Sequence, residues 1–180
     1  MFSLAMRLRD RLESAGNILL PSIARLVFGA VLLVYFWSSA LTKLGDGFLG
    51  FLYPSSGAYV QVFPAAMEAA GYDTGQLSLL HWAVVVAGTC AEFILPLLIV
   101  LGLFTRLAAL GMIGFVIVQS LVDITGHMAD PATIGRWFDK TSSALILDQR
   151  ALWVLLLLVL VFRGPGPLAV DRVFSSGSKG

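Results

Sequence analysis

The feature that most constrains this chain is an apolar run over residues 80–103 that contains a single charged side chain, Glu92. About 20 helical residues, at roughly 1.5 Å each, are enough to cross the hydrocarbon core of a bilayer. A carboxylate inside such a segment costs roughly 2.5–3.5 kcal/mol or more, so it normally faces the bundle interior and has a partner. The run therefore predicts a membrane-spanning helix, and Glu92 is the first candidate functional residue.

The composition of the whole chain agrees with this interpretation. Hydrophobic residues make up 58%, charged residues only 13%, and the mean hydropathy is +0.87, which together indicate a membrane protein. A net charge of +1 without a basic stripe argues against a nucleic-acid partner. The lone cysteine, Cys90, excludes an internal disulfide and a CxxC redox motif.

Hydropathy predicts an all-α fold, an integral membrane four-helix bundle with short amphipathic helices in its two long outer connections. The predicted spans are residues 21–41, 80–103, 107–122 and 148–163. The first 16 residues are amphipathic and charged without the features of a cleavable signal peptide, so we expect an interfacial helix on the cytoplasmic side. The bundle domain then covers residues 17–174, and residues 175–180 form a flexible tail.

The loop charges predict the orientation, because Lys and Arg are enriched on the cytoplasmic side of membrane spans. One side carries Arg7, Arg9, Arg11, Arg106, Arg163, Arg172 and Lys179, and the other carries Lys43, Arg136, Lys140 and Arg150. This bias of seven against four predicts that both termini are cytoplasmic.

Helical spacing predicts how the polar side chains group inside the bundle. Matching the ends of antiparallel helices brings Arg25 and Arg106 within reach of Glu92 from the cytoplasmic side. At the outer end, the same matching brings together Lys43, His81, Asp123 and His127, in which Lys43 and Asp123 form an ion pair. Gln119, Asp123 and His127 follow one another at four-residue intervals, which predicts a polar seam along the third span.

Each of these residues also has a purely structural interpretation. Arg106 is an ordinary topology anchor at a helix start, Lys43 a side chain that reaches back to water, and Arg25 a neutralising partner for Glu92. The two histidines lie too far apart for a haem site, and no close-spaced ligand motif supports a metal. We therefore assign no catalytic residue and no metal ligand from the sequence.

Five segments of the chain resemble the DoxX family of small four-helix bacterial membrane proteins, and the resemblance extends over nearly its whole length. The segments are residues 24–29, 41–44, 91–96, 102–109 and 163–171. Carried over by position, the polar residues of the family pattern are Arg25, Lys43, Glu92 and Arg106. Asp123 and His127 rest on spacing alone.

The resemblance implies a multi-pass protein of the bacterial cytoplasmic (inner) membrane. It also implies an accessory subunit of a quinone-linked redox assembly, more a non-catalytic subunit than a stand-alone oxidoreductase. Its partners are then the lipid bilayer, redox subunits and further copies of itself, and its only candidate cofactor is a non-covalently bound quinone. Two alternatives stay open: a small transporter or copper-stress protein, and a non-catalytic structural scaffold.

Overall fold

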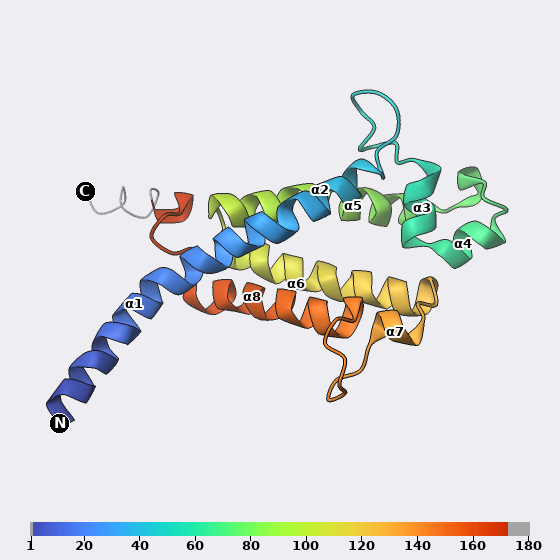
Figure 1. The fold of residues 1–180 in the computed structure, drawn as a ribbon. Helices are drawn as coiled ribbons and strands as arrows, with labels where there is room; N and C mark the ends of the chain where they lie inside the picture. Colours follow the sequence, from blue (N-terminus) through green and yellow to red (C-terminus); the bar gives the residue numbers. More distant parts are fainter. Residues whose placement is uncertain (1, 173–180) are drawn as a thin grey trace.

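The computed structural model describes residues 2–172, and these residues form helices and loops without a strand (Figure 1). Four helical segments are long and apolar enough to cross a membrane. The first is built from α1 (Phe2–Phe28), the π turn η1 (Gly29–Leu33) and α2 (Val34–Leu41), and the second is α5 (Leu79–Leu101). The third joins α6 (Thr105–Leu121) to the π turn η3 (Val122–Gly126), and the fourth joins the π turn η4 (Leu145–Gln149) to α8 (Arg150–Arg163). The predicted all-α membrane bundle is confirmed.

The bundle has two different ends, which we call the hairpin end and the loop end. At the hairpin end, residues 102–104 turn α5 directly into α6, and α8 ends close by (Figure 1). The loop end carries both long connections. The first connection contains α3 (Ser56–Val62), α4 (Pro64–Ala69) and the 3-10 turn η2 (Thr74–Gln76), and the second contains α7 (Pro131–Ile134). The short helices expected in these connections are therefore present.

The N-terminal segment differs from the expected separate helix. The helix α1 is continuous from Phe2 to Phe28, and its first half extends beyond the bundle at the hairpin end (Figure 1). Residues 5–15 are exposed, and burial begins at Pro21, where the other helices first cover α1. An interfacial location of this segment stays a prediction, and the expected tail at residues 175–180 lies outside the described residues.

The main core fills the middle of the bundle and its hairpin end. Along the first span, a buried stripe of Ala24, Phe28, Leu32 and Phe36 faces α6 and α8, whose contribution includes Ala108, Ala109, Met112, Leu157 and Leu160. Lipid tails are as apolar as these side chains, so close packing rather than transfer from water stabilises such a core. The small alanines allow the helices to approach one another, and the site described below lies beyond this core, toward the loop end.

A second, smaller core holds the loop-end helices against α5. It consists of Ala58, Tyr59 and Met67 from α3 and α4, packed on Val85 in the second turn of α5. Trp82 adds a hydrogen bond from Nε1 to the Leu52 carbonyl oxygen, at 2.8 Å. The first turns of α5 therefore face α3 rather than α2, and α2 ends beside the middle of α5.

The hairpin end is closed by the chain segment that follows α8. Both Asp171 carboxylate oxygens accept hydrogen bonds at the start of α6: from Phe104 N at 2.7 Å, and from Thr105 N and Oγ1 at 3.0 and 3.1 Å. Burial alone would raise the pKa of Asp171, but these hydrogen bonds and the charge of Arg25 lower it below its usual value. Gly102 has a φ of +70°, and a Cβ there would lie 2.6 Å from the Ala169 side chain, so this close approach requires glycine.

Candidate functional site

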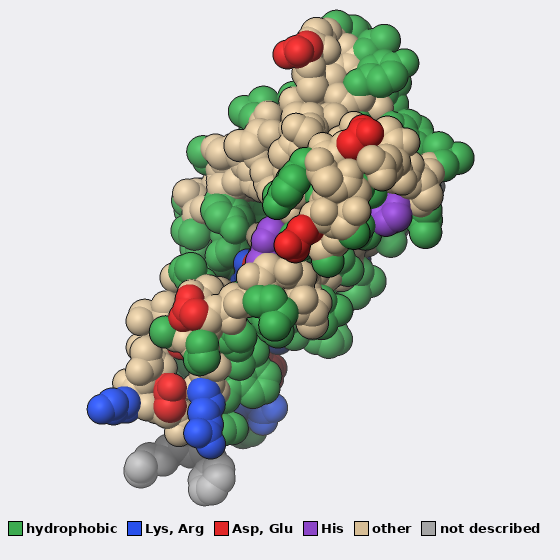
Figure 2. All heavy atoms as spheres, turned by 90° about the vertical axis from the view of Figure 1, so that its right-hand side faces the viewer, with side chains coloured by type: hydrophobic (Ala, Val, Ile, Leu, Met, Phe, Trp, Pro, Cys, Tyr) green, Lys and Arg blue, Asp and Glu red, His purple; other side chains and the backbone are tan. Residues whose placement is uncertain are grey.

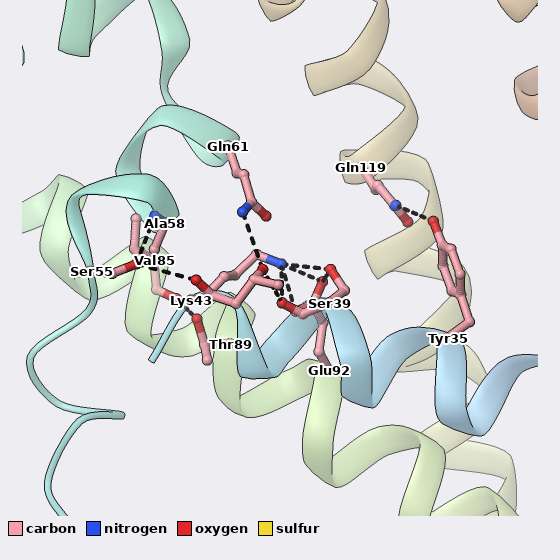
Figure 3. Close-up of polar contacts among 11 residues, drawn as sticks. Tyr35, Ser39, Lys43, Ser55, Ala58, Gln61, Val85, Thr89, Glu92 and Gln119 are labelled. Carbon is pink, nitrogen blue, oxygen red and sulfur yellow. Dashed lines mark hydrogen bonds and ion pairs between the residues drawn. The ribbon is translucent and has the colours of Figure 1, made fainter. Parts of the chain in front are cut away.

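The partner of Glu92 is Lys43, which lies just after the end of α2. Lys43 Nζ is 2.8 Å from Glu92 Oε2 and 3.0 Å from Oε1 (Figure 3). Ser39 joins the pair, since its hydroxyl donates to Glu92 Oε1 at 3.1 Å and accepts from Lys43 Nζ at 2.8 Å. Lys43 is 6% exposed and Glu92 3%, so both charges are withdrawn from solvent and compensate each other inside the protein.

The predicted pair between Arg25 and Glu92 is wrong. The Arg25 guanidinium instead donates to four backbone carbonyl oxygens at the hairpin end. They belong to Ile99, Val100, Pro165 and Leu168, at 3.1, 2.6, 2.9 and 2.8 Å. Arg25 therefore ties the end of α5, whose last carbonyls have no helical partner, to the segment after α8. Arg106 does not reach Glu92 either: it is exposed and makes no hydrogen bond or ion pair within the described part of the chain.

The error has a physical cause in the helix lengths. The prediction matched the end of the first span with the start of the second, but the first turns of α5 pack on α3 beyond the end of α2. Lys43 consequently lies level with Glu92, and its flexible side chain bends into the bundle instead of toward water. The π turn η1 also rotates every later position of the first span relative to a regular α-helix, so Arg25 and Lys43 serve different neighbours.

Asp123 pairs with Arg150, so the predicted ion pair between Lys43 and Asp123 is also wrong. Arg150 Nη2 is 2.5 Å from Asp123 Oδ2, and Nη1 donates to Ser120 Oγ at 3.0 Å. Arg150 is 8% exposed, although its position in the sequence predicted a loop charge. A basic residue at the start of the fourth span, opposite an acid at the end of the third, is the signal that would have identified it.

The two histidines have separate positions and do not form one cluster. His81 Nδ1 lies 2.8 Å from Ser78 Oγ in the capping box of α5, and its ring packs edge-on against Phe63. His127 Nε2 is 2.9 Å from the Gln61 carbonyl oxygen. Gln119 is nearer the centre, where its Nε2 donates to the Tyr35 hydroxyl at 3.2 Å and its Oε1 is buried without a partner (Figure 3). His81 thus lies apart from His127 and Gln119, which line the same cavity as the Lys43–Glu92 pair.

A cavity of about 450 Å³ connects these residues, and we call it the α5–α6 cavity. Its lining includes the buried Lys43 and Glu92 with Ser39, which we call the floor. It also includes the exposed Gln61 and His127 and the partly exposed Asp123, which we call the mouth, and Gln119 lines it as well. The walls are apolar and include Val84, Leu95, Phe115, Val118 and Val122. Figure 2 views the loop end and shows a histidine and a basic side chain beside a hollow in the surface. Most of the predicted polar residues thus surround one space, although their pairings differ from the prediction.

Glycines keep this cavity open. Gly88 on α5 and Gly114 on α6 both line it, and a Cβ built at either position would meet no atom within 4 Å. An added methyl group at either position would therefore narrow the cavity without colliding with the facing helix.

Comparison with known proteins places the chain in a family. The DoxX family model matches residues 20–128, which is more than half of the chain. The chain belongs to the DoxX family. The matched region contains the Lys43–Glu92 pair and every polar residue of the cavity, while Arg150 lies beyond it. No curated protein and no solved structure matches the chain.

The described residues contain no group of three or more His, Cys, Asp and Glu side chains arranged to hold a metal ion. Structural and catalytic metals usually take three or four such ligands from the protein. The polar groups of the cavity are instead suited to hydrogen bonding and to holding protons.

Proposed function

We propose that this DoxX family protein is an accessory subunit of a membrane redox assembly, and that the α5–α6 cavity holds the headgroup of a quinone. The observation that carries the proposal is an apolar-walled cavity inside a membrane bundle with a buried ion pair at its floor. Its volume of about 450 Å³ falls within the roughly 300–1,000 Å³ of small-molecule sites. Quinones are lipid-soluble and carry two oxygens on an apolar ring, which matches apolar walls with polar groups at the floor and the mouth.

The buried pair of Lys43 and Glu92 supports a role beyond packing. Replacing a buried ion pair by apolar side chains is often neutral or stabilising, so stability alone gives little reason for its presence. Ionisable residues within membrane segments are expensive and commonly mark ligand or proton pathways. Glu92 lies where it can exchange protons with a ligand in the cavity, and Lys43 compensates its charge.

An accessory role follows from the chemistry of the cavity residues. Ammonium, carboxylate, amide and imidazole groups hold and transfer protons, but they do not carry electrons at ordinary cellular potentials. We therefore assign the electron transfer to a partner subunit, and to this chain the binding of the quinone and the handling of its protons.

The test is quinone-linked electron transfer in membranes of cells that carry Glu92→Gln. We expect a reduced rate at unchanged protein level, because the glutamine keeps the shape of the side chain but neither charge nor an exchangeable carboxyl proton. Glu68→Gln, on the exposed face of α4, is the matched control and should leave the rate unchanged. An unaltered rate in the Glu92 variant would contradict the proposal.

A small-solute transporter is the second candidate function, favoured by the polar mouth that Gln61, Asp123 and His127 form at the loop end. In that case Glu92→Gln should change the uptake or export of a solute while respiration is normal. The copper-stress form of this alternative lacks a ligand cluster within residues 2–172. A scaffold without a ligand would be indicated if the double variant Lys43→Gln/Glu92→Gln retained full electron transfer.

A further inference from the structure

We infer that two loops at the loop end, residues 45–54 and 135–144, are anchors that insert apolar side chains into the surface of the bilayer. The partner of these loops is the interfacial layer of the membrane, and the main contacts are made by Phe48 and Phe138. Neither loop lines the α5–α6 cavity, so this anchoring is independent of the proposed function.

Both loops lie level with the edge of the hydrocarbon core. The first span ends at Leu41, four residues before the first loop begins. The fourth membrane-spanning segment begins at Leu145, directly after the second loop, and its 19 residues cover about 28 Å at roughly 1.5 Å each. The hydrocarbon core is itself about 30 Å thick, so this segment has no residues to spare. Its first residue therefore lies at the membrane surface, and the loop before it lies there too.

The loops project sideways from the bundle instead of continuing along its axis. In Figure 1, the segment between α2 and α3 extends to one side of the bundle, and the segment between α7 and α8 extends to the opposite side. A loop that continued along the axis would meet water, whereas a loop that turns sideways at this depth meets lipid headgroups. Contacts on two opposite sides also favour the bilayer over a partner subunit, because a single partner would cover one side.

In the first loop, hydrogen bonds within the backbone hold the tip in one shape. Gly45 N donates to the Gly50 carbonyl oxygen at 3.0 Å, and Gly50 N donates to that of Gly47 at 3.1 Å. Phe48 lies within this closed turn and is 96% exposed, so the folded chain gains almost nothing from its ring. A rigid tip that presents a phenyl group can bind an apolar environment without first losing conformational freedom.

In the second loop, Phe138 has a strained backbone that no contact within the chain explains. Its φ of +64° lies in the left-handed region, which is rare for a bulky residue, and its side chain is fully exposed. Trp137, whose Nε1 donates to the Leu147 carbonyl oxygen at 3.0 Å, is of a residue type enriched at membrane interfaces. Arg136 and Lys140 flank the two aromatic residues, where their cations can contact lipid phosphates. A contact with the bilayer accounts for this combination of side chains.

The test uses an environment-sensitive fluorescent label on a single cysteine of the full-length chain in lipid nanodiscs. Cys90→Ala removes the native cysteine, and Phe48→Cys, Phe138→Cys or Glu68→Cys introduces the labelled one. Glu68 is the matched control, because it is exposed at the same end of the bundle but on α4 rather than on either loop. We expect lipids that carry a spin label near the headgroup to quench both loop labels several-fold more than the Glu68 label, and aqueous iodide to quench them several-fold less.

Two results would overturn the inference. One is a label on either loop that is quenched by both reagents to the same extent as the Glu68 label, because that loop would then lie in water. The other is shielding of the loop labels from both reagents, because a protein surface rather than the bilayer would then cover them.

Two variants of Phe138 separate the effect of its ring from the effect of its backbone strain. Phe138→Ser and Phe138→Leu both keep a side chain at the positive φ, but only leucine keeps an apolar one. With the label at Thr141→Cys, an exposed position of the same loop, serine should raise quenching by iodide several-fold and leucine should leave it unchanged. Equal quenching in the two variants would overturn the role of Phe138 as an anchor.

Discussion

Breaking the buried ion pair provides the most quantitative test of this structure. In Lys43→Met, a side chain of similar length loses its charge and Glu92 is left buried at 3% exposure. At 2.8 Å and an effective dielectric constant near 20, the gross attraction between the two charges is about 6 kcal/mol. Much of this offsets the desolvation of the two ions, and breaking such a pair on one side costs about 3–5 kcal/mol. We expect Lys43→Met to lose that much unfolding free energy.

The double variant Lys43→Met/Glu92→Met should be much less damaging than Lys43→Met, because no uncompensated charge then stays in the bundle. The assay is equilibrium unfolding in mixed micelles with increasing denaturing detergent, followed by far-UV circular dichroism. Lys140→Met, at an exposed loop position, is the control and should change the unfolding free energy by less than about 0.5 kcal/mol. A Lys43→Met variant as stable as the control would contradict this expectation, and so would losses in Lys43→Met and Glu92→Met that simply add in the double variant.

Three further changes test other parts of the structure. Arg25→Gln should lose at least about 3 kcal/mol, because a charged donor to four carbonyls is removed, and faster amide hydrogen exchange after residue 163 would show it. Asp171→Asn should cost about 1 kcal/mol above pH 5, measured by unfolding as a function of pH. Since the folded pKa of Asp171 is lowered, its contribution is present above the usual carboxyl pKa and is lost as the pH falls through the folded value, where the variant and the parent should converge. Gly114→Leu should narrow the cavity and weaken quinone binding, measured by titration of the purified protein, with little loss of stability, since a Cβ there meets open space.

The fold was largely predictable because the signals for membrane helices are strong and local. Length and hydropathy alone identify four spans, and the short link at residues 102–104 forces α5 and α6 into an antiparallel hairpin. The surface helices of the connections were also visible in the spacing of their apolar residues. None of these predictions depends on how far one helix is shifted along the bundle axis relative to its neighbour.

The partners of the charged side chains were not predictable, because they depend on this shift between neighbouring helices. The chain between α2 and α5 folds back as α3 and α4 and covers the first turns of α5, which shifts α2 relative to α5. With this shift, Lys43 rather than Arg25 meets Glu92. A pattern of charges on separate helices has no information about such a shift, and the π turns add rotations that a regular 3.6-residue repeat does not include.

The same shift explains why the cavity lies where it does. The π turn η1 shortens the first span, and α2 ends at Leu41 before it reaches the loop end. The helices α5 and α6 continue past this point, where they face each other without the first span. Gly88 and Gly114 leave their facing surfaces without side chains, so a space stays open between them. Lys43, just past the end of the shortened span, supplies the positive charge that pairs with Glu92 at the floor of this space. We expect that a lengthened α2 would both remove the cavity and separate Lys43 from Glu92. The position of the ion pair and the position of the cavity therefore both depend on where α2 ends.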